Sequence, residues 1–330
     1  MTHLSNKSSN GNQMTAAQNA VVLCAVTNST DPVNDISDYP TDWKIVWNGI
    51  QTPEGNYAFI AADPAGENYA LAIRGSLPGK IFGNWDVFSN WVLEDFNVLA
   101  QVAWGYATTA NPKISNGAYI AFENLLSMQD SLGSGLNVTD YLVTKAVKPG
   151  KNVIITGHSL GGNMANVYAS YFITTITGLK YPSGKVSLYT FAAPAPGNGD
   201  FATDLDAKLP AAWHYQNYND IIPNFPVAGN VLKMGSKYSP SPAASAITFI
   251  NDDGNTITLR DAFIILSGVL TLCGYKQQTN NYTIFNNKLD ERFEENTMKD
   301  WFYQAGSQHN ISNYATYLGL PQLQSAKQYV

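Results

Sequence analysis

Residues 154–162 read Ile154-Ile155-Thr156-Gly157-His158-Ser159-Leu160-Gly161-Gly162. An apolar β-branched run stops there at a Gly-x-Ser-x-Gly pentad, and a segment of helical character follows over residues 163–174. A strand, a sharp turn and a helix in this order are typical of a nucleophile elbow, which exposes a serine at the top of a sheet. The helix directs its positive N-terminal end at that serine, where backbone N–H groups can stabilise negative charge. The pattern predicts a nucleophilic Ser159, and the alternative is a glycine-rich turn without chemistry.

A nucleophilic serine needs a base, and the base needs a carboxylate that holds its tautomer and orientation. The chain has four histidines. His3 lies in a polar tail, and His158 is expected to point away from the Oγ of Ser159. His214 lies in a strand-like run that precedes the best candidate acid. His309, in a polar loop context near the C-terminus, leaves room for an acid between nucleophile and base, which is the chain order of α/β-hydrolases. We therefore predict His309 as the base.

Asp220 is the predicted acid. It ends a strand-like run over residues 213–219 and is followed by Ile221, Ile222 and Pro223. Catalytic residues of open α/β sheets gather at the carboxyl ends of strands, and a proline directs the chain out of the sheet there. The alternative role for this residue is a turn-capping aspartate. Two other groups of carboxylates lie between Ser159 and His309, a polar stretch expected to be solvated surface (Asp200, Asp204, Asp206) and a charge run typical of an exposed helix face (Asp290, Glu291, Glu294, Glu295).

Several blocks, taken together, resemble the fungal-type, or class 3, lipases of the α/β-hydrolase superfamily. The matching blocks are residues 73–76, 90–95, 157–162, 190–198 and 219–226, and His309 with Tyr314. The resemblance implies one α/β-hydrolase domain over residues 1–330, with a central, mostly parallel sheet flanked by helices and a helical lid over the active site. It also implies an oxyanion hole made by the backbone N–H groups of Ser76 and Leu160. One block departs from the family, because Ala103 stands where the family usually has a histidine outside the triad.

A lid is predicted over residues 77–92. Ile81, Trp85, Phe88 and Val92 recur at spacings of four, three and four, which puts them on one helical face. Phe82 and Trp91 widen this apolar surface, and the segment follows the block that resembles the oxyanion strand, where the family carries its lid. The predicted lid and substrate-binding residues are Ile81, Phe82, Trp85, Phe88 and Trp91. The alternative is a static helix packed on the core.

A second long segment, residues 227–297, is predicted to be an insertion between acid and base. It contains an apolar stretch over residues 262–273, which is too short to span a bilayer as a helix. Two interpretations stay open for this stretch, a buried core helix or a helix that lines an acyl-chain pocket or docks on lipid. Residues 247–250 and 256–259 flank an Asp-Gly turn and predict a β-hairpin.

Composition indicates an ordinary globular enzyme. The chain has 330 residues, 45% of them hydrophobic, and a formal net charge of −6. This negative net charge argues against a nucleic-acid partner and against electrostatic docking on anionic membranes. The sequence shows no cluster with metal-ligand spacing, so we expect neither a metal nor another cofactor. Two cysteines, Cys24 and Cys273, leave both a disulfide and free thiols open.

The function these observations favour is carboxylic-ester hydrolysis by a Ser-Asp-His triad, most simply a triacylglycerol lipase whose acyl-ester substrate lies at a lipid–water interface. The alternatives are an esterase for soluble short-chain or aryl esters, a phospholipid acyl hydrolase, or a non-catalytic hydrolase-like binding module. No transmembrane segment is expected, and the oligomeric state stays open. The polar N-terminus lacks the apolar core of a signal peptide. It indicates a cytoplasmic enzyme, one secreted by a signal-independent route, or one whose leader has been removed.

Overall fold

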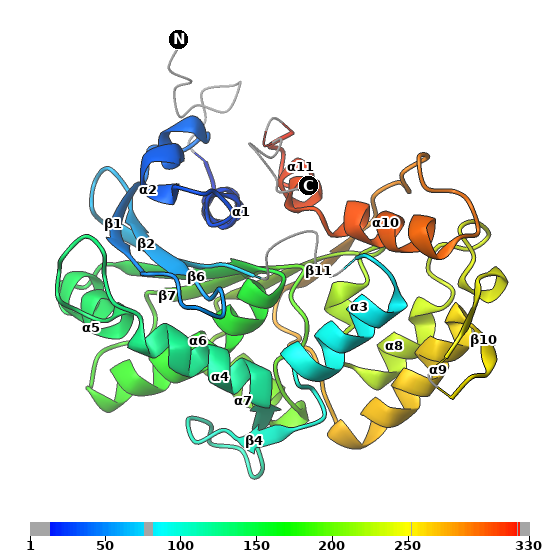
Figure 1. Ribbon diagram of the computed structural model, residues 1–330. Coiled ribbons are helices and arrows are strands. Elements are labelled where there is room, and N and C mark those ends of the chain that lie inside the picture. Colours follow the sequence, from blue (N-terminus) through cyan, green and yellow to red (C-terminus); the bar gives the residue numbers. More distant parts are fainter. Residues whose placement is uncertain (1–13, 76–81, 252, 322, 324–330) are drawn as a thin grey trace.

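A seven-stranded sheet organises the chain in the computed structural model, which describes residues 14–75, 82–251, 253–321 and 323 (Figure 1). The strands are β1 (Lys44–Asn48), β2 (Ala58–Ala62), β3 (Asn68–Ile73), β6 (Asn152–His158), β7 (Val186–Phe191), β8 (Ala212–Asn217) and β11 (Tyr282–Phe285), in that spatial order. The pairs β1–β2 and β2–β3 are antiparallel, whereas β3, β6, β7, β8 and β11 pair in parallel. The predicted mostly parallel central sheet of an α/β-hydrolase is therefore confirmed.

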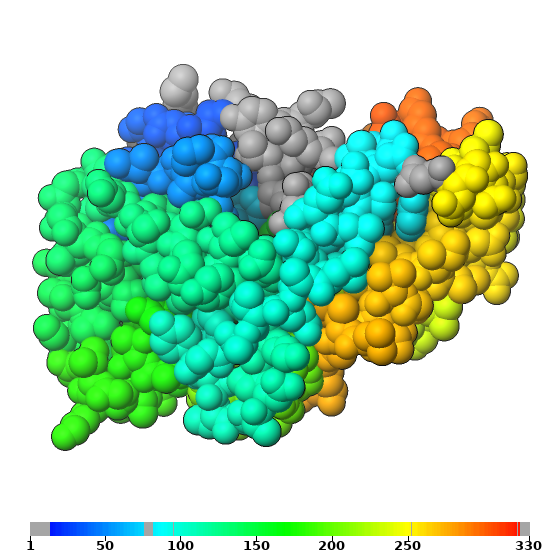
Figure 2. Space-filling view, turned by 60° about the horizontal axis from the view of Figure 1, so that its bottom comes forward, coloured from blue at the N-terminus to red at the C-terminus, as the bar shows by residue number. Residues whose placement is uncertain are grey.

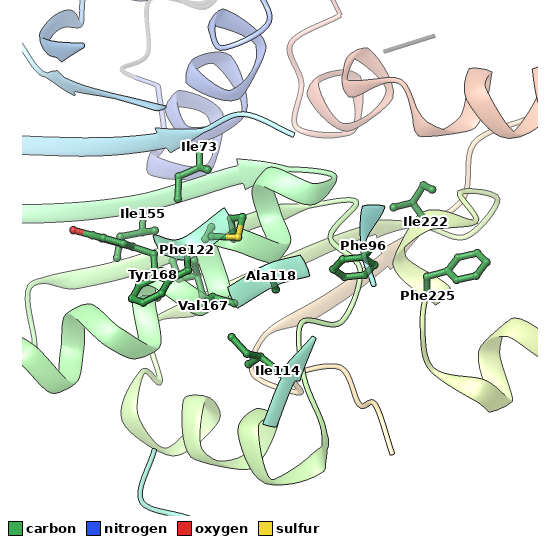
Figure 3. Packing of buried hydrophobic residues seen from close by; sticks show 14 of the residues in the cluster. Ile73, Phe96, Ile114, Ala118, Phe122, Ile155, Val167, Tyr168, Ile222 and Phe225 are labelled. Atoms are coloured by element: carbon green, nitrogen blue, oxygen red, sulfur yellow. The ribbon is translucent and has the colours of Figure 1, made fainter. Parts of the chain in front are cut away.

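Helices cover both faces of this sheet, because successive strand residues point to opposite sides and both sides are apolar. The helices are α1 (Ala16–Val26) and α11 (Ile311–Tyr317) on one face, and α4 (Asn116–Ser127) and α6 (Leu160–Gly178) on the other (Figure 1). In β6, Ile154 belongs to the core under α1 and α11, and Ile155 belongs to the core with α4 and α6. Figure 3 shows Ile155 beside Phe122 and Val167 of that second core. The elbow serine thus follows a strand that is buried from both sides.

Further helices and strands surround this layer. The helices are α2 (Pro32–Asp35), α3 (Trp85–Asn90), α5 (Val138–Leu142), α7 (Gly199–Lys208), α8 (Ala228–Met234), α9 (Leu259–Leu270) and α10 (Met298–His309). Two small antiparallel pairs are β4 (Gln101–Ala103) with β5 (Lys113–Ser115), and β9 (Thr248–Ile250) with β10 (Thr256–Thr258). The short 3-10 or π turns are η1 (Ile36–Asp38), η2 (Trp91–Asp95), η3 (Val143–Val147), η4 (Ile222–Asn224), η5 (Ala244–Ala246) and η6 (Thr271–Cys273). The predicted β9–β10 hairpin is confirmed.

Residues 227–297 form a substructure beside the sheet and also complete it. The segment contains α8, the β9–β10 hairpin and α9, and α8 packs closely against α9 (Figure 1). It then returns to the sheet as β11, the edge strand parallel to β8. The parts before and after β11 lie outside the central sheet.

Two sequence-based expectations about local structure are wrong. His309 is the last residue of α10 and not a loop residue, because Thr297 caps that helix and Trp301, Phe302 and Ala305 bury one side of it. The charge run is expected on an exposed helix face, but residues 291–297 form turns. In this turn Arg292 pairs with Asp290 at 2.6 Å.

The expectation of a solvated acidic stretch also fails at Asp204. This carboxylate is 2% exposed on α7. It pairs with Nζ of Lys208 at 2.6 Å and accepts hydrogen bonds from the backbone N–H and the hydroxyl of Thr108. The carboxylate can be buried because it is hydrogen-bonded and paired with a cation. These contacts join the loop after β4 to α7.

The two cysteines are free thiols. Cys24 is buried in α1 and lies 3.2 Å from Oγ1 of Thr156, and burial raises the pKa of its thiol to about 12. Cys273 is partly exposed at the end of α9, on a different part of the molecule (Figure 1). The disulfide alternative is therefore excluded in this structure.

Candidate active site

Ser159 occupies a strained turn between β6 and α6. Its φ of 59° and ψ of −132° are unusual for a residue with a side chain. Its backbone N–H donates to the carbonyl of Phe191 in the neighbouring strand at 2.9 Å, which fixes the turn to the sheet. The side chain of this N-cap residue does not cap α6. The first N–H groups of the helix are left available, and the hydroxyl is directed elsewhere.

Two glycines make this turn sterically possible. A Cβ on Gly157 would lie 2.1 Å from the carbonyl oxygen of Gly161. A Cβ on Gly161 would lie 2.1 Å from the carbonyl oxygen of Ile73. The start of α6 therefore crosses both β6 and β3 at backbone contact distance, and only glycine fits at these positions.

The three residues predicted as a triad lie in one hydrogen-bonded chain. Nε2 of His309 lies 2.8 Å from Oγ of Ser159, and Nδ1 of His309 lies 2.8 Å from Oδ2 of Asp220. All three side chains are buried. A carboxylate that accepts from Nδ1–H leaves Nε2 as the acceptor for the serine proton, which is the arrangement that general-base activation of a hydroxyl requires.

The Asp220 carboxylate is held by groups besides the histidine. Oδ2 also accepts from the hydroxyl of Tyr314 on α11 at 2.7 Å, and Oδ1 accepts from the backbone N–H of Ile222 at 2.9 Å. Burial, and then the nearby Asp220 charge, raise the pKa of Tyr314 well above its usual range. The phenol therefore stays protonated and serves as a permanent donor to the carboxylate.

The side chain of His158, the residue before the nucleophile, supports the base by a contact with the backbone of His309. Its Nε2 donates to the carbonyl oxygen of His309 at 2.9 Å, and the two rings lie 4.7 Å apart between centroids. Burial and then the neighbouring His309 lower the pKa of His158 well below its usual range. As predicted from the sequence, this side chain bonds away from Oγ of Ser159, and it stays neutral.

A second polar contact joins the strand that precedes the acid to the helix that carries the base. Nδ2 of Asn217, at the end of β8, donates to the carbonyl oxygen of Gln308 at 3.0 Å and to its Oε1 at 2.9 Å. The backbone N–H of Asn217 donates to the hydroxyl of Tyr314. Sequence reasoning missed Asn217 and Gln308, since isolated amides carry no motif.

Comparisons with known proteins agree with this geometry. The family model for "Lipase (class 3)" matches residues 85–230, a range that includes the elbow and Asp220. A solved structure, "Crystal structure of M37 lipase", superposes with a TM-score of 0.73, with 94% of this chain and 95% of that chain covered at 22% identity. Residues 85–230 therefore resemble the class 3 lipase family, and the superposition supports the fold.

Curated relatives of this chain match over shorter stretches. "Secreted mono- and diacylglycerol lipase 1" of Fusarium solani is 24% identical over 55% of this chain and 46% of its own length. "Phospholipase A1-II 1" of Oryza sativa is 28% identical over 36% of this chain and 29% of its own length. The chain thus spans less than half the length of these relatives.

Part of the predicted oxyanion hole lies within the described residues. Leu160 is the first residue of α6, directly after Ser159, so its backbone N–H belongs to the helix end at the nucleophile. Gly75 lies close by, since a Cβ there would be 3.1 Å from Cβ of Ser159. Ser76 lies outside the described residues, and its part in the hole stays a prediction.

The described part of the predicted lid is packed over the site. The ring of Phe82 lies 5.5 Å from the ring of His309. It also lies over Gly306 on α10, where a Cβ would approach the ring to 3.3 Å. Phe88 is fully buried on α3, and Trp85 packs beside it. Ile81 lies outside the described residues.

An aromatic cluster holds α3 in this position. Phe88 packs against Phe225, Phe263 and Phe302 with ring centroids 5.0 to 6.3 Å apart. Trp91, the fifth predicted lid residue, is buried between Phe88 and Phe96. The three rings around Phe88 come from the residue after η4, from α9 and from α10, so the lid segment is held by parts of the chain next to the acid and the base.

No metal site is evident in the described part of the chain, where no group of three or more His, Cys, Asp or Glu side chains could hold an ion. Across the described ranges, no helix has both the length and the apolar character that a bilayer crossing demands.

Proposed function

We propose that this chain is a carboxylic-ester hydrolase, most simply a triacylglycerol lipase, that works through a Ser-Asp-His triad and a covalent acyl-enzyme. One observation carries the proposal: the continuous hydrogen-bonded chain from Oγ of Ser159 through His309 to Asp220, with both distances 2.8 Å. A structural serine has no need of a buried imidazole that is itself held by a buried carboxylate.

The reaction follows from this chain of contacts. Oγ of Ser159 attacks the ester carbonyl carbon while Nε2 of His309 takes the hydroxyl proton, and Asp220 stabilises the imidazolium that forms. His309 then gives the proton to the departing alcohol as the carbon–oxygen bond breaks. Water, deprotonated by the same imidazole, attacks the acyl-enzyme and releases the acid.

The negative oxygen of each tetrahedral intermediate needs fixed donors. The backbone N–H of Leu160 is one, and that of Ser76 is proposed as the second. Both would act where the positive end of α6 meets the nucleophile. Loss of one such donor costs on the order of a hundred- to a thousand-fold in rate.

An apolar substrate is supported by what covers the base. Phe82 lies over His309, and Phe88 fills an aromatic cluster with no exposed surface. We propose that residues 77–92 act as a lid that shields this surface in water and moves away at a lipid–water interface, where its aromatic side chains find an apolar environment. A static helix on the core is the competing interpretation of the same packing.

The substrate class is the finer part of the proposal. The names of the two curated relatives, a mono- and diacylglycerol lipase and a phospholipase A1, support a lipid ester and keep phospholipid acyl hydrolysis as the second candidate. An esterase for soluble short-chain or aryl esters would use the same triad without need of a lid. A non-catalytic binding module has no use for the complete hydrogen-bonded chain.

The place of action is proposed from the same comparison. The Fusarium solani relative is named as secreted, which supports an extracellular enzyme for this chain among the locations that its sequence leaves open. A lipid ester as partner fits either side of a membrane, and a nucleic-acid partner is disfavoured by the net charge of −6.

The test compares two substrates in wild type and in Ser159→Ala. Emulsified long-chain triacylglycerol and a dissolved short-chain p-nitrophenyl ester are assayed side by side, with the circular dichroism of both proteins as a folding control. Activity on both substrates that rises once the lipid forms a separate phase, and is lost in Ser159→Ala, is the expected result. Activity confined to the dissolved ester identifies the esterase. Equal hydrolysis by the folded Ser159→Ala variant contradicts the proposed triad.

A further inference from the structure

Helix α9 is apolar on its outward side as well as on its buried side. Leu259, Phe263, Leu266 and Leu270 are buried, as expected for a helix that packs on a core. The opposite side carries four large aliphatic residues with exposed fractions of 42% for Ile264, 55% for Ile265, 47% for Val269 and 96% for Leu272. Their spacing of one, four and three aligns them along the helix and the turn η6 that continues it. We call these four residues the α9 stripe.

The α9 stripe lies directly behind the proposed lid. Phe263, on the buried side of α9, packs edge-on against Trp85 of the lid helix at 5.3 Å and against Phe88 at 6.3 Å. In Figure 2 the cyan atoms of the α3 region and the yellow-orange atoms of α9 lie side by side on one face of the molecule. A lipid surface that covers this face would therefore meet α3 and the helix that carries the stripe together.

Charge is absent along the stripe. Residues 262–273 contain no Asp, Glu, Lys or Arg. The charged residues of α9, Arg260 and Asp261, stand in its first turn, and Asp261 serves there in the capping box with Thr258. Together with a net charge of −6, this composition favours an uncharged apolar partner over an anionic one.

The size of the stripe argues against a second protein as that partner. Its four side chains expose roughly the surface of two to three whole aliphatic residues, a few hundred Å² at most. A stable protein–protein interface usually buries about 800 Å² on each side. A lipid surface imposes no such minimum, since a few aliphatic side chains inserted to the headgroup boundary already contribute binding energy in proportion to their area.

We propose that the α9 stripe docks the enzyme on an uncharged lipid surface, independently of the lid. The helix lies in the plane of that surface with Ile264, Ile265, Val269 and Leu272 inserted, which places the neighbouring α3 at the lipid where it must open. The proposal rests on the proposed function, because it assigns a means of reaching the lipid substrate to the same site. It adds a fixed docking element that is present before the lid moves.

The docking step is measured without catalysis, in the full chain carrying Ser159→Ala. Binding to phosphatidylcholine vesicles that contain a small fraction of trioleoylglycerol is followed by flotation. Adding Ile265→Glu or Leu272→Glu puts a charge into the stripe. We expect each substitution to lower the constant for partition of the protein onto the vesicles at least about tenfold. Raising the salt from about 0.05 M to about 1 M should leave wild-type binding unchanged or stronger, because the contact is apolar.

Leu179→Glu is the matched control. Leu179 is a leucine exposed to 55% beyond the far end of α6, a helix of 19 residues that begins at the nucleophile and is about 28 Å long. The same charge placed there should leave vesicle binding unchanged. With Ser159 restored, Leu272→Glu should keep full activity on a dissolved short-chain ester and lose activity on emulsified triacylglycerol.

The outcomes separate this proposal from the proposed function. Unchanged vesicle binding in Leu272→Glu overturns the docking role, whatever the enzyme hydrolyses. So does a shift from dimer to monomer in this variant with vesicle binding intact, which would make the stripe a contact between two copies of the chain. Failure of the wild-type enzyme to hydrolyse either the dissolved ester or emulsified triacylglycerol overturns the proposed function and leaves the flotation result standing.

Discussion

The hydroxyl of Tyr314 donates to Oδ2 of Asp220 at 2.7 Å, the same carboxylate oxygen that lies 2.8 Å from Nδ1 of His309. Two donors therefore converge on one buried oxygen, one from α11 and one from the end of α10. Since the other oxygen is bonded to the backbone of Ile222, the carboxylate is fixed in plane as well as in position. Tyr314 is thus a positioning residue for the acid of the proposed triad, five positions after the base.

Replacing Tyr314 by phenylalanine should lower kcat on a dissolved ester by about tenfold or more, with KM little changed. A hydrogen bond to a charged group contributes about 1.5–3 kcal/mol, and here its loss loosens the carboxylate that orients His309. Tyr317→Phe, on the exposed side of the same helix, is the control and should behave as wild type. Unchanged kcat in a folded Tyr314→Phe variant would show that Ile222 and His309 hold the carboxylate without help.

Gly161→Ala should destabilise the protein by about 3 kcal/mol or more. Its Cβ would lie 2.1 Å from the carbonyl oxygen of Ile73, a backbone atom of the central sheet that cannot move aside cheaply. Gly178, at the other end of α6, has open space where a Cβ would be placed. Gly178→Ala should therefore be neutral or stabilise the helix by up to about 1 kcal/mol. Urea denaturation of both variants measures the difference, and similar midpoints would contradict the proposed backbone clash.

The stability of the chain should fall on acidification because of a buried histidine outside the site. Nδ1 of His214 on β8 lies 2.7 Å from Oγ1 of Thr190, and burial lowers the pKa of this histidine to about 4. An unfolded histidine has a pKa of about 6.5, so the unfolded chain takes up a proton that the folded chain refuses. The free energy of unfolding therefore decreases as the pH falls from about 6.5 to about 4, by roughly 3 kcal/mol from this group. Buried His158 acts in the same direction.

His214→Asn removes this titration and keeps a polar partner for Thr190. Its free energy of unfolding, measured in urea at several values of pH between about 7 and about 4, should change less steeply than that of wild type. The comparison of slopes matters more than either absolute stability, because His158 titrates in both proteins. Parallel curves for the two proteins would mean that His214 does not carry the effect.

Much of the site could be predicted because its chemistry constrains the chain locally. Ser159 could be predicted because the glycines on either side of it are those that a tight strand-to-helix turn requires. The order of nucleophile, acid and base then favoured His309, which follows the best candidate acid, whereas His214 precedes it. Asp220 was recognisable from the strand before it and Pro223 after it. The inferences for Ser159 and Asp220 used neighbours within a few positions, which is the range over which sequence patterns carry structural information.

The remainder depends on contacts between distant segments. Asn217 and Gln308 are 91 positions apart and carry no motif, yet their amides join the end of β8 to the end of α10. Asp204 looked solvated because its neighbours are polar, and it is buried because Thr108 and Lys208 satisfy it. Such pairings are set by how the elements pack, and no local pattern encodes them.

Phe82→Ala should uncover the base and weaken the dependence on an interface. The Phe82 ring lies 5.5 Å from the His309 ring and rests on Gly306, so its removal opens a path to Nε2 without touching the hydrogen-bonded chain. We expect kcat/KM on a dissolved ester to rise several-fold, while the ratio of emulsion activity to solution activity falls, because part of the cover is already gone. Phe293→Ala, which removes a half-buried ring that packs on Tyr303, controls for the loss of an aromatic side chain. If Phe82→Ala left both rates as in wild type, residues 82–92 would be a static helix on the core, and the rise of activity at an interface would need another source.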